Sequence, residues 1–450
     1  MIMNESERMV NGNLWKDILI FSLPLILSNL LQVLFNTSDI IVVGQFAGAN
    51  SLGSVGSTVN LVTLFTSFLI GLSNGVNVLV GRNLGSKDHK SVKDIVHNSF
   101  IVCLITGIII FLLGFFFSRN ILILMQTKDE LLDGAILYLK IYFVGMPALA
   151  IYNYGNAIYS AAGNTRKPLL YLSIAGVLNI LLNLFFVIVC KLDVAGVAIA
   201  SAISQYVSAI LIVISLIKTK EPYHLSLKEL KVSKERTKEL LSLGLPSGLQ
   251  AAIFAIANIF IQSAVNTLPT EIVDGNAAAQ NADTFTWQIM DAFYVASSSF
   301  ISQNLGAKKK KRIKETYFIT TLYSFSISLI IGILLFFFAE PFLNIFVKEK
   351  DVVLAGLDRL KIMAFSYCIS AFMDGTIASS RGLGKTVVPT IIVISGSCVL
   401  RIVWIYTIFA HFKTITSLYL LYSCSWFITA VAEIIYFIFA YKKVTKNLED

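Results

Sequence analysis

Long runs of apolar residues set the strongest limit on how this chain can fold. The run FIVCLITGIIIFLLGFFF (residues 100–117) contains no charged side chain, and neither does YLSIAGVLNILLNLFFVIVC (171–190). A helix of about 20 residues spans the hydrocarbon core of a bilayer. Because a chain in hydrocarbon must satisfy its backbone amides within each segment, these runs are predicted to be helices. The predicted fold class is an all-α polytopic membrane protein, in keeping with 56% hydrophobic and 14% charged residues.

Twelve transmembrane helices are predicted along the chain from these runs and from the polar breaks between them. Their predicted ranges are 15–44, 52–81, 94–117, 131–161, 168–190, 194–217, 239–267, 276–303, 315–339, 352–380, 387–410 and 415–441.

The basic residues fall mostly on one side of the predicted membrane. With the N-terminus placed inside, the inside segments hold 26 Lys and Arg residues and the outside loops hold six. Such a bias marks the cytoplasmic side. The net charge of +9 is thus explained by topology, and we do not expect nucleic acid as a partner. We expect a multi-pass protein of the cell membrane with both termini in the cytoplasm.

The chain lacks the patterns of common metal and catalytic sites. Its five cysteines form no CxxC pair, and its four histidines form no HExxH motif. The segment GLGKT (382–386) resembles the end of a phosphate-binding loop, but Ser379 stands where the full motif requires glycine, and a membrane span precedes it instead of a strand. We interpret this segment as a helix end, and we expect no catalytic residue, metal site or cofactor.

The chain repeats itself at a fixed separation of 221 residues. NLGSKDHK (83–90) returns as NLGAKKKK (304–311), LKI (139–141) returns at 360–362, and GNTRKP (163–168) returns as GKTVVP (384–389). Upstream, SLP (22–24) returns as GLP (244–246) with a slip of one residue. Chance similarity between apolar helices does not easily place such polar motifs in one register, so the repeat indicates a duplication.

The duplication predicts two halves of six helices each. We predict an N-terminal lobe over residues 1–217, a cytoplasmic linker over 218–238 that includes a short surface helix, and a C-terminal lobe over 239–450. Because six is even, both halves enter the membrane from the same side. This is the arrangement of transporters whose parallel repeats are related by an axis along the membrane normal.

The order and spacing of these motifs resemble those of the multidrug and toxic compound extrusion (MATE) transporters over nearly the whole chain. The matching motifs are SLP followed by NTSDIIVVGQFAG (36–48), the two NLGxK turns, AAGNTRKP after the fourth helix and SSRGLGKTVVP after the tenth. The resemblance implies twelve helices in two lobes around a central cavity. It also implies export driven by protons or sodium ions.

Asp39 is the candidate for binding the coupling cation. Asn36 and Asp39 lie on one face of the first predicted helix. A charged residue at the bilayer centre costs roughly 2.5–3.5 kcal/mol, so an acid in a span is a candidate for function. The resemblance implies that Asp39 is a cation-coupling residue. A structural role, in which Asp39 holds helices together by hydrogen bonds, remains the alternative.

Asn179 and Asn183 share one face of the fifth predicted helix and are candidates for the same site. Members of the resembled family often carry an acid where Asn183 stands. An amide can orient water or bind sodium through its carbonyl oxygen, but it cannot take up a proton. A helix–helix contact through the two amides is the alternative.

We expect the substrate site in the second half of the chain. Trp287, Asp291 and Tyr294 share a face of the eighth predicted helix, where a carboxylate beside aromatic rings suits an organic cation. Asp374 lies in the tenth predicted helix, two turns after Tyr367, and these two residues form a second candidate pair.

Three further charged residues of the second half are expected to be structural. Asp283 and Glu433 are nearer to helix ends, where we expect interfacial or structural contacts. A cation within a span needs a partner, and for Arg401 that partner could be Asp374 or Glu433.

The sequence favours a secondary exporter of amphipathic, cationic organic compounds that is driven by a proton or sodium gradient. A flippase for a lipid-linked precursor is the first alternative, and few Lys and Arg residues within the spans count against it. A membrane-embedded enzyme is the second, and the missing catalytic motifs count against it. The expected partners are a small organic substrate and membrane lipid, with the protein acting as a monomer.

Overall fold

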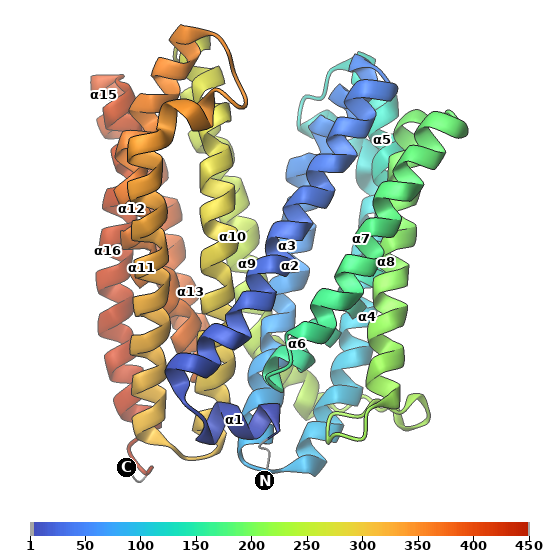
Figure 1. Ribbon diagram of the computed structural model, residues 1–450, viewed down its shortest axis with the longest axis vertical. Coiled ribbons are helices and arrows are strands. Elements are labelled where there is room, and N and C mark those ends of the chain that lie inside the picture. The colour runs from blue at the N-terminus through green and yellow to red at the C-terminus, as the bar shows by residue number, and fades with distance from the viewer. Residues whose placement is uncertain (1–3, 449–450) are drawn as a thin grey trace. The chain divides into compact units, whose positions relative to one another are not determined.

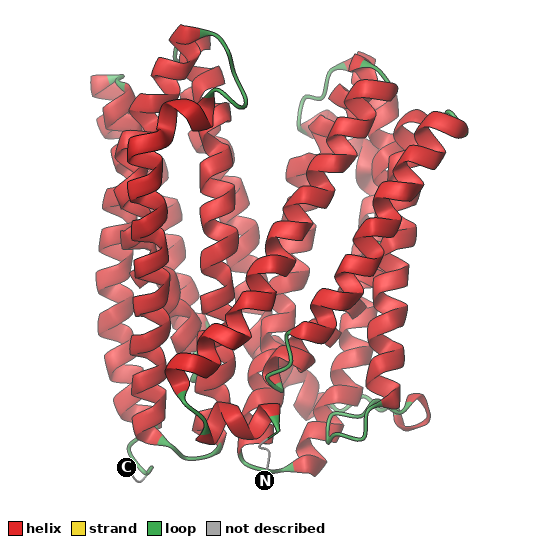
Figure 2. Cartoon of the chain, in the orientation of Figure 1, coloured by secondary structure: helices red, strands yellow, loops and turns green. Residues whose placement is uncertain are grey.

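The computed structural model describes residues 4–448, which form helices joined by short turns and contain no strand (Figure 2). Each of the twelve predicted spans falls on helical residues, the fourth of them on two helices in succession, and every predicted boundary lies within seven residues of the observed one. The predicted all-α fold class is therefore confirmed. Residues 1–3 and 449–450, at the ends of the two predicted lobes, lie outside the described residues.

The first compact unit contains Leu23–Ala251 together with the described residues up to Ser6 (Figure 1). Its helices are α2 (Leu14–Phe46) from Leu23 onward, α3 (Ala49–Gly85), α4 (His89–Leu124), α5 (Asp129–Val144), α6 (Met146–Ala161), α7 (Arg166–Leu184), α8 (Asp193–Lys218) and α9 (Lys234–Val265) as far as Ala251. A π-helical turn, η1 (Phe185–Val189), continues α7.

The second compact unit contains Glu7–Ser22 and the described residues from Ala252 onward. Besides α1 (Glu5–Asn11) from Glu7 onward, α2 as far as Ser22 and α9 from Ala252 onward, its helices are α10 (Thr270–Gly306), α11 (Lys310–Leu343), α12 (Lys350–Gly382) and α16 (Ile415–Val444). The eleventh span is α13 (Val387–Val393), α14 (Leu400–Trp404) and α15 (Ala410–Phe412), joined by the π-helical turns η3 (Ile394–Val399) and η4 (Ile405–Phe409).

Nine helices within residues 4–448 are long and apolar enough to cross a membrane, or ten if α5 and α6 count as one span. The pair α5 and α6 is bent by 45° at Gly145, where Pro147 stands in the first turn of the new helix. The two remaining long helices, α10 and α12, carry the acidic and basic residues discussed below.

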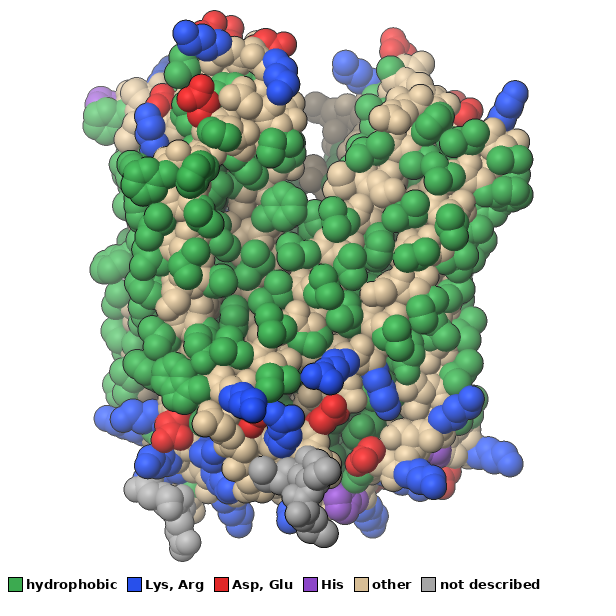
Figure 3. Space-filling view, in the orientation of Figure 1, with side chains coloured by type: hydrophobic (Ala, Val, Ile, Leu, Met, Phe, Trp, Pro, Cys, Tyr) green, Lys and Arg blue, Asp and Glu red, His purple; other side chains and the backbone are tan. Residues whose placement is uncertain are grey.

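The middle of the helices is covered by apolar side chains on the face shown in Figure 3, while Lys and Arg side chains gather at the lower helix ends. Phe116 is 68% exposed, and Phe337, which lies 221 residues later, is 72% exposed. Exposed apolar side chains in such number and continuity are favourable in lipid and unfavourable in water. The chain is therefore a multi-pass membrane protein.

The duplicated NLGxK motif forms the same turn at the end of α3 and of α10. Lys87 and Lys308 have left-handed φ values of 59° and 60°. The N–H of the following residue donates to the carbonyl of Asn83 at 3.0 Å in the first copy and of Asn304 at 2.9 Å in the second. Each asparagine side chain also donates to a carbonyl one turn earlier, at 2.8 Å in both copies. The repeated sequence thus encodes a repeated helix-terminating turn.

The GNTRKP and GKTVVP motifs also end helices by one common turn. Gly163 follows α6 with φ of 89°, and Gly384 follows α12 with φ of 75°. The N–H of the residue after each glycine donates to a carbonyl five positions earlier, at 2.9 Å in both copies. The interpretation of GLGKT as a helix end is confirmed, because glycine supplies the left-handed conformation that stops the helix.

The boundaries of the two units differ from the predicted lobes at residues 217 and 239, because the first part of α9 packs on α3. Gly71 and Gly75 of α3 face Gly244 and Gly248 of α9, and a Cβ built on Gly71 would lie 2.5 Å from the backbone nitrogen of Gly248. Two such GxxxG pairs let helix backbones approach closely. Residues 219–233 before α9 contain a short 3-10 helix, η2 (Leu227–Glu229), whose residues are exposed, as expected for a short surface helix.

The segment before and at the start of α2 packs in the second unit in a corresponding way. The Asn304 side chain donates to the carbonyl of Met9 at 3.2 Å, and Tyr323 donates to the carbonyl of Trp15 at 3.1 Å. Phe21 packs edge-on against Phe300 with ring centres 5.4 Å apart. Each half of the chain therefore has an entry segment that packs with helices of the other half.

The left-handed conformation of Lys308 leads to a test of the repeated turn. We expect Lys308→Gly to stabilise the protein by about 1 kcal/mol, because a left-handed conformation costs a residue with a Cβ roughly that much. The measurement is the thermal unfolding midpoint of the purified protein in detergent. Lys314→Gly, an exposed position inside α11, is the matched control and should destabilise by about 0.5–1 kcal/mol. Equal effects of the two substitutions would contradict the role of the turn.

Candidate functional site

A buried polar cluster in the first unit is centred on Asp39 of α2. Asn179 and Asn183 reach it from α7, and Ser201 reaches it from α8. These four side chains are between 0% and 9% exposed. Three helices thus bring together one acid, two amides and a hydroxyl in otherwise apolar surroundings. The structure joins Asp39, Asn179 and Asn183 as neighbours, while their roles in cation binding stay a prediction.

The hydrogen bonds of this cluster converge on the Asp39 carboxylate. The Asn183 amide donates to Oδ1 of Asp39, and Ser201 Oγ donates to Oδ2 at 3.1 Å. Asn183 also donates to Oδ1 of Asn179 at 3.2 Å, and Asn179 donates to Ser201 Oγ at 3.4 Å. Donors from two helices therefore stabilise the charged form of one carboxylate.

One oxygen of the cluster has no hydrogen-bond donor among the described residues. The carbonyl oxygen Oδ1 of Asn183 is buried and accepts no hydrogen bond. A buried acceptor without a partner is costly and usually marks a water, an ion or a functional group. Together with the oxygens of Asp39, Asn179 and Ser201, it forms an oxygen-rich environment with one negative charge, which suits one proton or one monovalent cation.

Asn36 does not belong to this cluster, although it shares a face with Asp39 in sequence. Its side chain is exposed, whereas Asp39 is buried. Ser201 was missed by the sequence analysis, because an isolated serine in an apolar helix gives no distinct signal. The π-helical turn that begins at Phe185, just after Asn183, is a feature often found at functional sites.

Two tyrosines of α5 lie within electrostatic range of Asp39. The charge of Asp39 interacts electrostatically with both Tyr138 and Tyr142. The two tyrosine rings stack on each other with their centres 5.6 Å apart. Tyr138 is 6% exposed. The aromatic pair therefore lies close to the acid, which the sequence analysis did not anticipate for this half of the chain.

In the second unit, Asp283 and Arg359 form an ion pair between α10 and α12. Arg359 is 1% exposed and Asp283 is 23% exposed by side chain. The Tyr367 hydroxyl donates to the other oxygen of Asp283, and the Arg359 guanidinium lies 5.3 Å from the ring centre of Tyr419. The Tyr367 hydroxyl is thus engaged by Asp283, and whether Tyr367 acts with Asp374 in binding substrate stays a prediction. The ion pair agrees with a structural role for Asp283.

Arg401 of α14 does not form the expected ion pair within residues 4–448. Its Nε donates to Ser425 at 3.0 Å, and its guanidinium lies 4.7 Å from the ring centre of Tyr422 and 5.7 Å from those of Phe254 and Trp426. Asp374 interacts with it only at longer range. Three aromatic faces therefore hold this buried cation, which cation–π attraction makes possible.

The predicted substrate residues Asp291, Tyr294 and Asp374 do come together in the second unit. Tyr294 lies within electrostatic range of both acids, and its hydroxyl is 3.5 Å from Ser324 Oγ. Asp374 also interacts electrostatically with Arg381, near the end of α12. Whether these groups bind substrate stays a prediction.

Glu433 and Trp287 are the two remaining residues of this unit that the sequence analysis singled out. Glu433 is 0% exposed, and neither of its carboxylate oxygens accepts a hydrogen bond from a described residue, which favours the structural over the interfacial of its two expected roles. Trp287 is half-buried and packs near Trp426, with ring centres 6.4 Å apart.

Comparison with known proteins decides the family. The MatE family model matches residues 24–185 and, a second time, residues 246–407. The two matches cover more than half of the 450 residues and coincide with the internal repeat. This chain belongs to the MATE family. It is a transporter of the multidrug efflux type, with a small molecule as its substrate.

Relatives of this MATE transporter agree with that assignment. A probable multidrug resistance protein of Bacillus subtilis (strain 168), YpnP, is 30% identical over 360 residues, which cover 79% of this chain and 80% of the relative. A solved multidrug resistance MATE family transporter in an outward-facing conformation matches with a TM-score of 0.92 at 22% identity, covering 99% of this chain and 100% of that one.

A second solved structure is a MOP superfamily transporter from Pyrococcus furiosus, described as having a binding pocket of reverse polarity. It matches with a TM-score of 0.91 at 22% identity and covers 99% of both chains. At this identity the structural likeness establishes the shared fold alone.

The ion pair of the MATE transporter's second unit gives a prediction about stability. Asp283→Leu should destabilise the protein by about 3–5 kcal/mol, because it leaves the buried Arg359 guanidinium without its counter-ion. Arg359→Met should cost less, since Asp283 is partly exposed and keeps the Tyr367 hydrogen bond. The double variant should recover most of the loss.

The measurement is a double-mutant cycle on unfolding midpoints of the purified protein. A strongly non-additive result supports the ion pair, because residues in contact are energetically coupled. Additive losses in the two single variants would show that the Asp283–Arg359 contact contributes little.

Proposed function

We propose that this MATE transporter exports amphipathic, cationic organic compounds in exchange for one proton or sodium ion bound at Asp39. The observation that carries the proposal is the convergence of Asn183 and Ser201 on one buried carboxylate, beside an amide oxygen without a donor. A buried charge of this kind is stable only when it is paired or neutralised. A monovalent cation matches the single charge.

Coupling requires that the cation and the drug favour different states of the transporter. Asp39 lies on α2, while its partners Asn183 and Ser201 lie on α7 and α8. A protonated carboxyl group keeps one acceptor oxygen and gains a donor, so one of these hydrogen bonds must rearrange on protonation. Cation binding would then change the packing of α2 against its neighbours. Pro24 within α2 offers a place where the helix can bend.

The acids and aromatic rings of the second unit support a cationic substrate. Asp291 and Asp374 lie near Tyr294, and a carboxylate close to aromatic rings attracts an organic cation by charge and by cation–π contact. A flippase for a lipid-linked precursor would need basic groups free to bind a pyrophosphate. Arg359 is instead paired with Asp283, and Arg401 is held among aromatic rings.

We infer that the protein lies in the cell membrane with both termini in the cytoplasm. The support is the excess of Lys and Arg in the segments on that side, which is the usual cytoplasmic bias. We expect it to act as a monomer with lipid around its exposed apolar faces.

Export of a fluorescent lipophilic cation from proteoliposomes tests the proposal. Proton and sodium gradients are imposed separately, for the natural protein and for Asp39→Asn. One-for-one exchange of a proton for a monovalent drug moves no net charge, so each pH unit supplies about 1.4 kcal/mol, enough for a roughly tenfold drug gradient. We expect one gradient to drive export and Asp39→Asn to abolish it.

Export that survives in Asp39→Asn would reject Asp39 as the coupling site and direct attention to Asp291 and Asp374. An absence of export under both gradients would reject the drug-export proposal. Lipid-linked substrates would then be tested in the same vesicles.

Ser201→Ala should distinguish the two coupling ions by the sign of its effect. Ser201 donates to Asp39, so its loss removes a donor from the charged carboxylate and should make proton binding tighter. The same loss removes an oxygen ligand for sodium and should make sodium binding weaker. We expect a change of about tenfold or more in the ion concentration that gives half-maximal export, because a hydrogen bond to a charged group contributes about 1.5–3 kcal/mol.

Ser204→Ala is the matched control for this prediction. Ser204 is also buried on α8, but its hydroxyl donates to the carbonyl of Ala200 in its own helix at 2.8 Å. We expect its half-maximal ion concentration to match that of the natural protein. An equal change in both variants would mean that the effect arises from α8 as a whole.

A further inference from the structure

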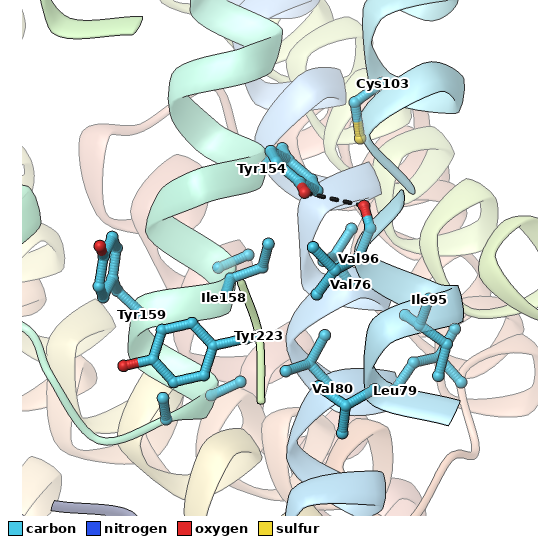
Figure 4. Packing of buried hydrophobic residues seen from close by; sticks show 14 of the residues in the cluster. Val76, Leu79, Val80, Ile95, Val96, Cys103, Tyr154, Ile158, Tyr159 and Tyr223 are labelled. Atoms are coloured by element: carbon cyan, nitrogen blue, oxygen red, sulfur yellow. Dashed lines mark hydrogen bonds between the residues drawn. The ribbon is translucent and has the colours of Figure 1, made fainter. Parts of the chain in front are cut away.

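The linker between α8 and α9 packs tightly onto the first unit. Leu225 is fully buried, and its N–H donates to the carbonyl of Leu216 at 3.0 Å. Tyr223 is 7% exposed, and its ring packs edge-on against Tyr159 with ring centres 5.8 Å apart. Figure 4 shows these two rings beside the apolar residues of α3, α4 and α6. The linker is therefore part of the core at this end of the unit.

Two adjacent side chains of α4 hold the linker by its backbone. The N–H of Ser226 donates to Nε2 of His97 at 3.0 Å. The N–H of Ser233 donates to Oδ1 of Asn98 at 2.8 Å, and Thr237 donates to the same oxygen at 3.0 Å. His97 is 3% exposed and Asn98 is fully buried. The first contact depends on a group that can take up a proton, and the second does not.

The hydrogen bonds of His97 determine which ring nitrogen carries its hydrogen. Nδ1 lies 2.6 Å from the carbonyl oxygen of Lys93, which can only accept, so Nδ1 carries the hydrogen. Nε2 accepts from the Ser226 N–H, so it carries none. The ring is therefore neutral in this arrangement. A proton added at Nε2 would face the Ser226 N–H and remove that hydrogen bond.

The carboxylate of Glu229 lies close enough to form an ion pair with a protonated His97 ring. Oε2 of Glu229 lies 3.9 Å from Nε2 of His97 and 2.6 Å from Nζ of Lys93. The hydrogen bond from Lys93 holds the pKa of the Glu229 carboxyl below its ordinary value, so Glu229 is charged wherever histidine titrates. The other titratable groups at this contact are His224 in the linker and Tyr154 of α6, whose hydroxyl donates to the carbonyl of Val96.

We propose that His97 is a proton-binding site at which protonation exchanges the Ser226 hydrogen bond for an ion pair with Glu229, and so releases the middle of the linker from α4. The neutral ring holds the linker by its backbone, and the charged ring holds only a side chain at the surface. The Asn98 contact keeps the linker attached at Ser233. This site lies in the first turns of α4, at the end where the linker packs, and does not depend on which ion drives transport.

Hydrogen exchange of the full-length protein in lipid nanodiscs tests the proposal. Exchange of the linker amides is measured near pH 7.5 and near pH 5.5, and each rate is divided by that of an unstructured peptide at the same pH. We expect opening at Ser226 to rise at least about fivefold at the lower pH, as the loss of one hydrogen bond implies. Opening at Ser233, held by the Asn98 amide, should stay unchanged and serves as the internal control.

Two variants make the result specific to His97. His97→Gln offers an amide oxygen to Ser226 and cannot titrate in this range, so opening at Ser226 should no longer depend on pH. Glu229→Gln removes the negative charge that stabilises the protonated ring and should move the transition to lower pH.

Three outcomes would overturn the proposal. They are a Ser226 amide whose opening is the same at both pH values in the natural protein, a pH response that persists in His97→Gln, and an equal response of Ser226 and Ser233. If His97→Gln does not fold, the shift in Glu229→Gln decides alone, and an unchanged transition in that variant rejects the ion pair.

Discussion

The requirement that backbone amides in hydrocarbon be satisfied within each span governs the rest of this structure. It leaves helices as the spanning elements, so the backbone is largely unavailable to form a binding site. Sites must therefore be built from side chains, or at the few places where the helix departs from its regular pattern. The π-helical turns beside Asn183 and around Arg401 are such places. Both lie in the fifth span of their half of the chain.

The two halves share a backbone plan but bury different charged groups. Tyr138, near Asp39, corresponds to Arg359. The first unit thus buries an acid among hydrogen-bond donors, and the second buries cations against aromatic rings and one acid. Duplication supplied two scaffolds, and substitution made their interiors chemically different.

Much of the fold was predictable because it depends on local sequence. Apolar runs determined the twelve spans, and the NLGxK and GNTRKP motifs marked turns whose conformation is local. Asp39, Asn179 and Asn183 were also predictable as a group, since polar residues in apolar helices are rare and helical spacing places them on faces. The contact of Ser201 was not, because serine is common in such helices and can bond to its own backbone, as Ser204 does.

The partners of the charged residues were the least predictable part. Which acid meets Arg359 depends on how α10 and α12 are rotated about their axes, and the sequence of one helix does not contain that information. The same reason explains why Arg401 was assigned an acidic partner but packs on aromatic rings. The GxxxG contact of α3 with α9 was not predictable from local sequence either, because it joins residues that lie more than 160 positions apart.

The first segment of each half of the chain packs with helices of the other half, and this has a consequence for biosynthesis. Residues 7–22 are made first, yet their packing partners, among them Phe300, Asn304 and Tyr323, emerge near the end of synthesis. The first unit in turn needs the start of α9, which belongs to the second half of the sequence. Neither half of the chain contains all of the helices of one compact unit. Each compact unit is therefore complete only when segments from both halves of the sequence have been made.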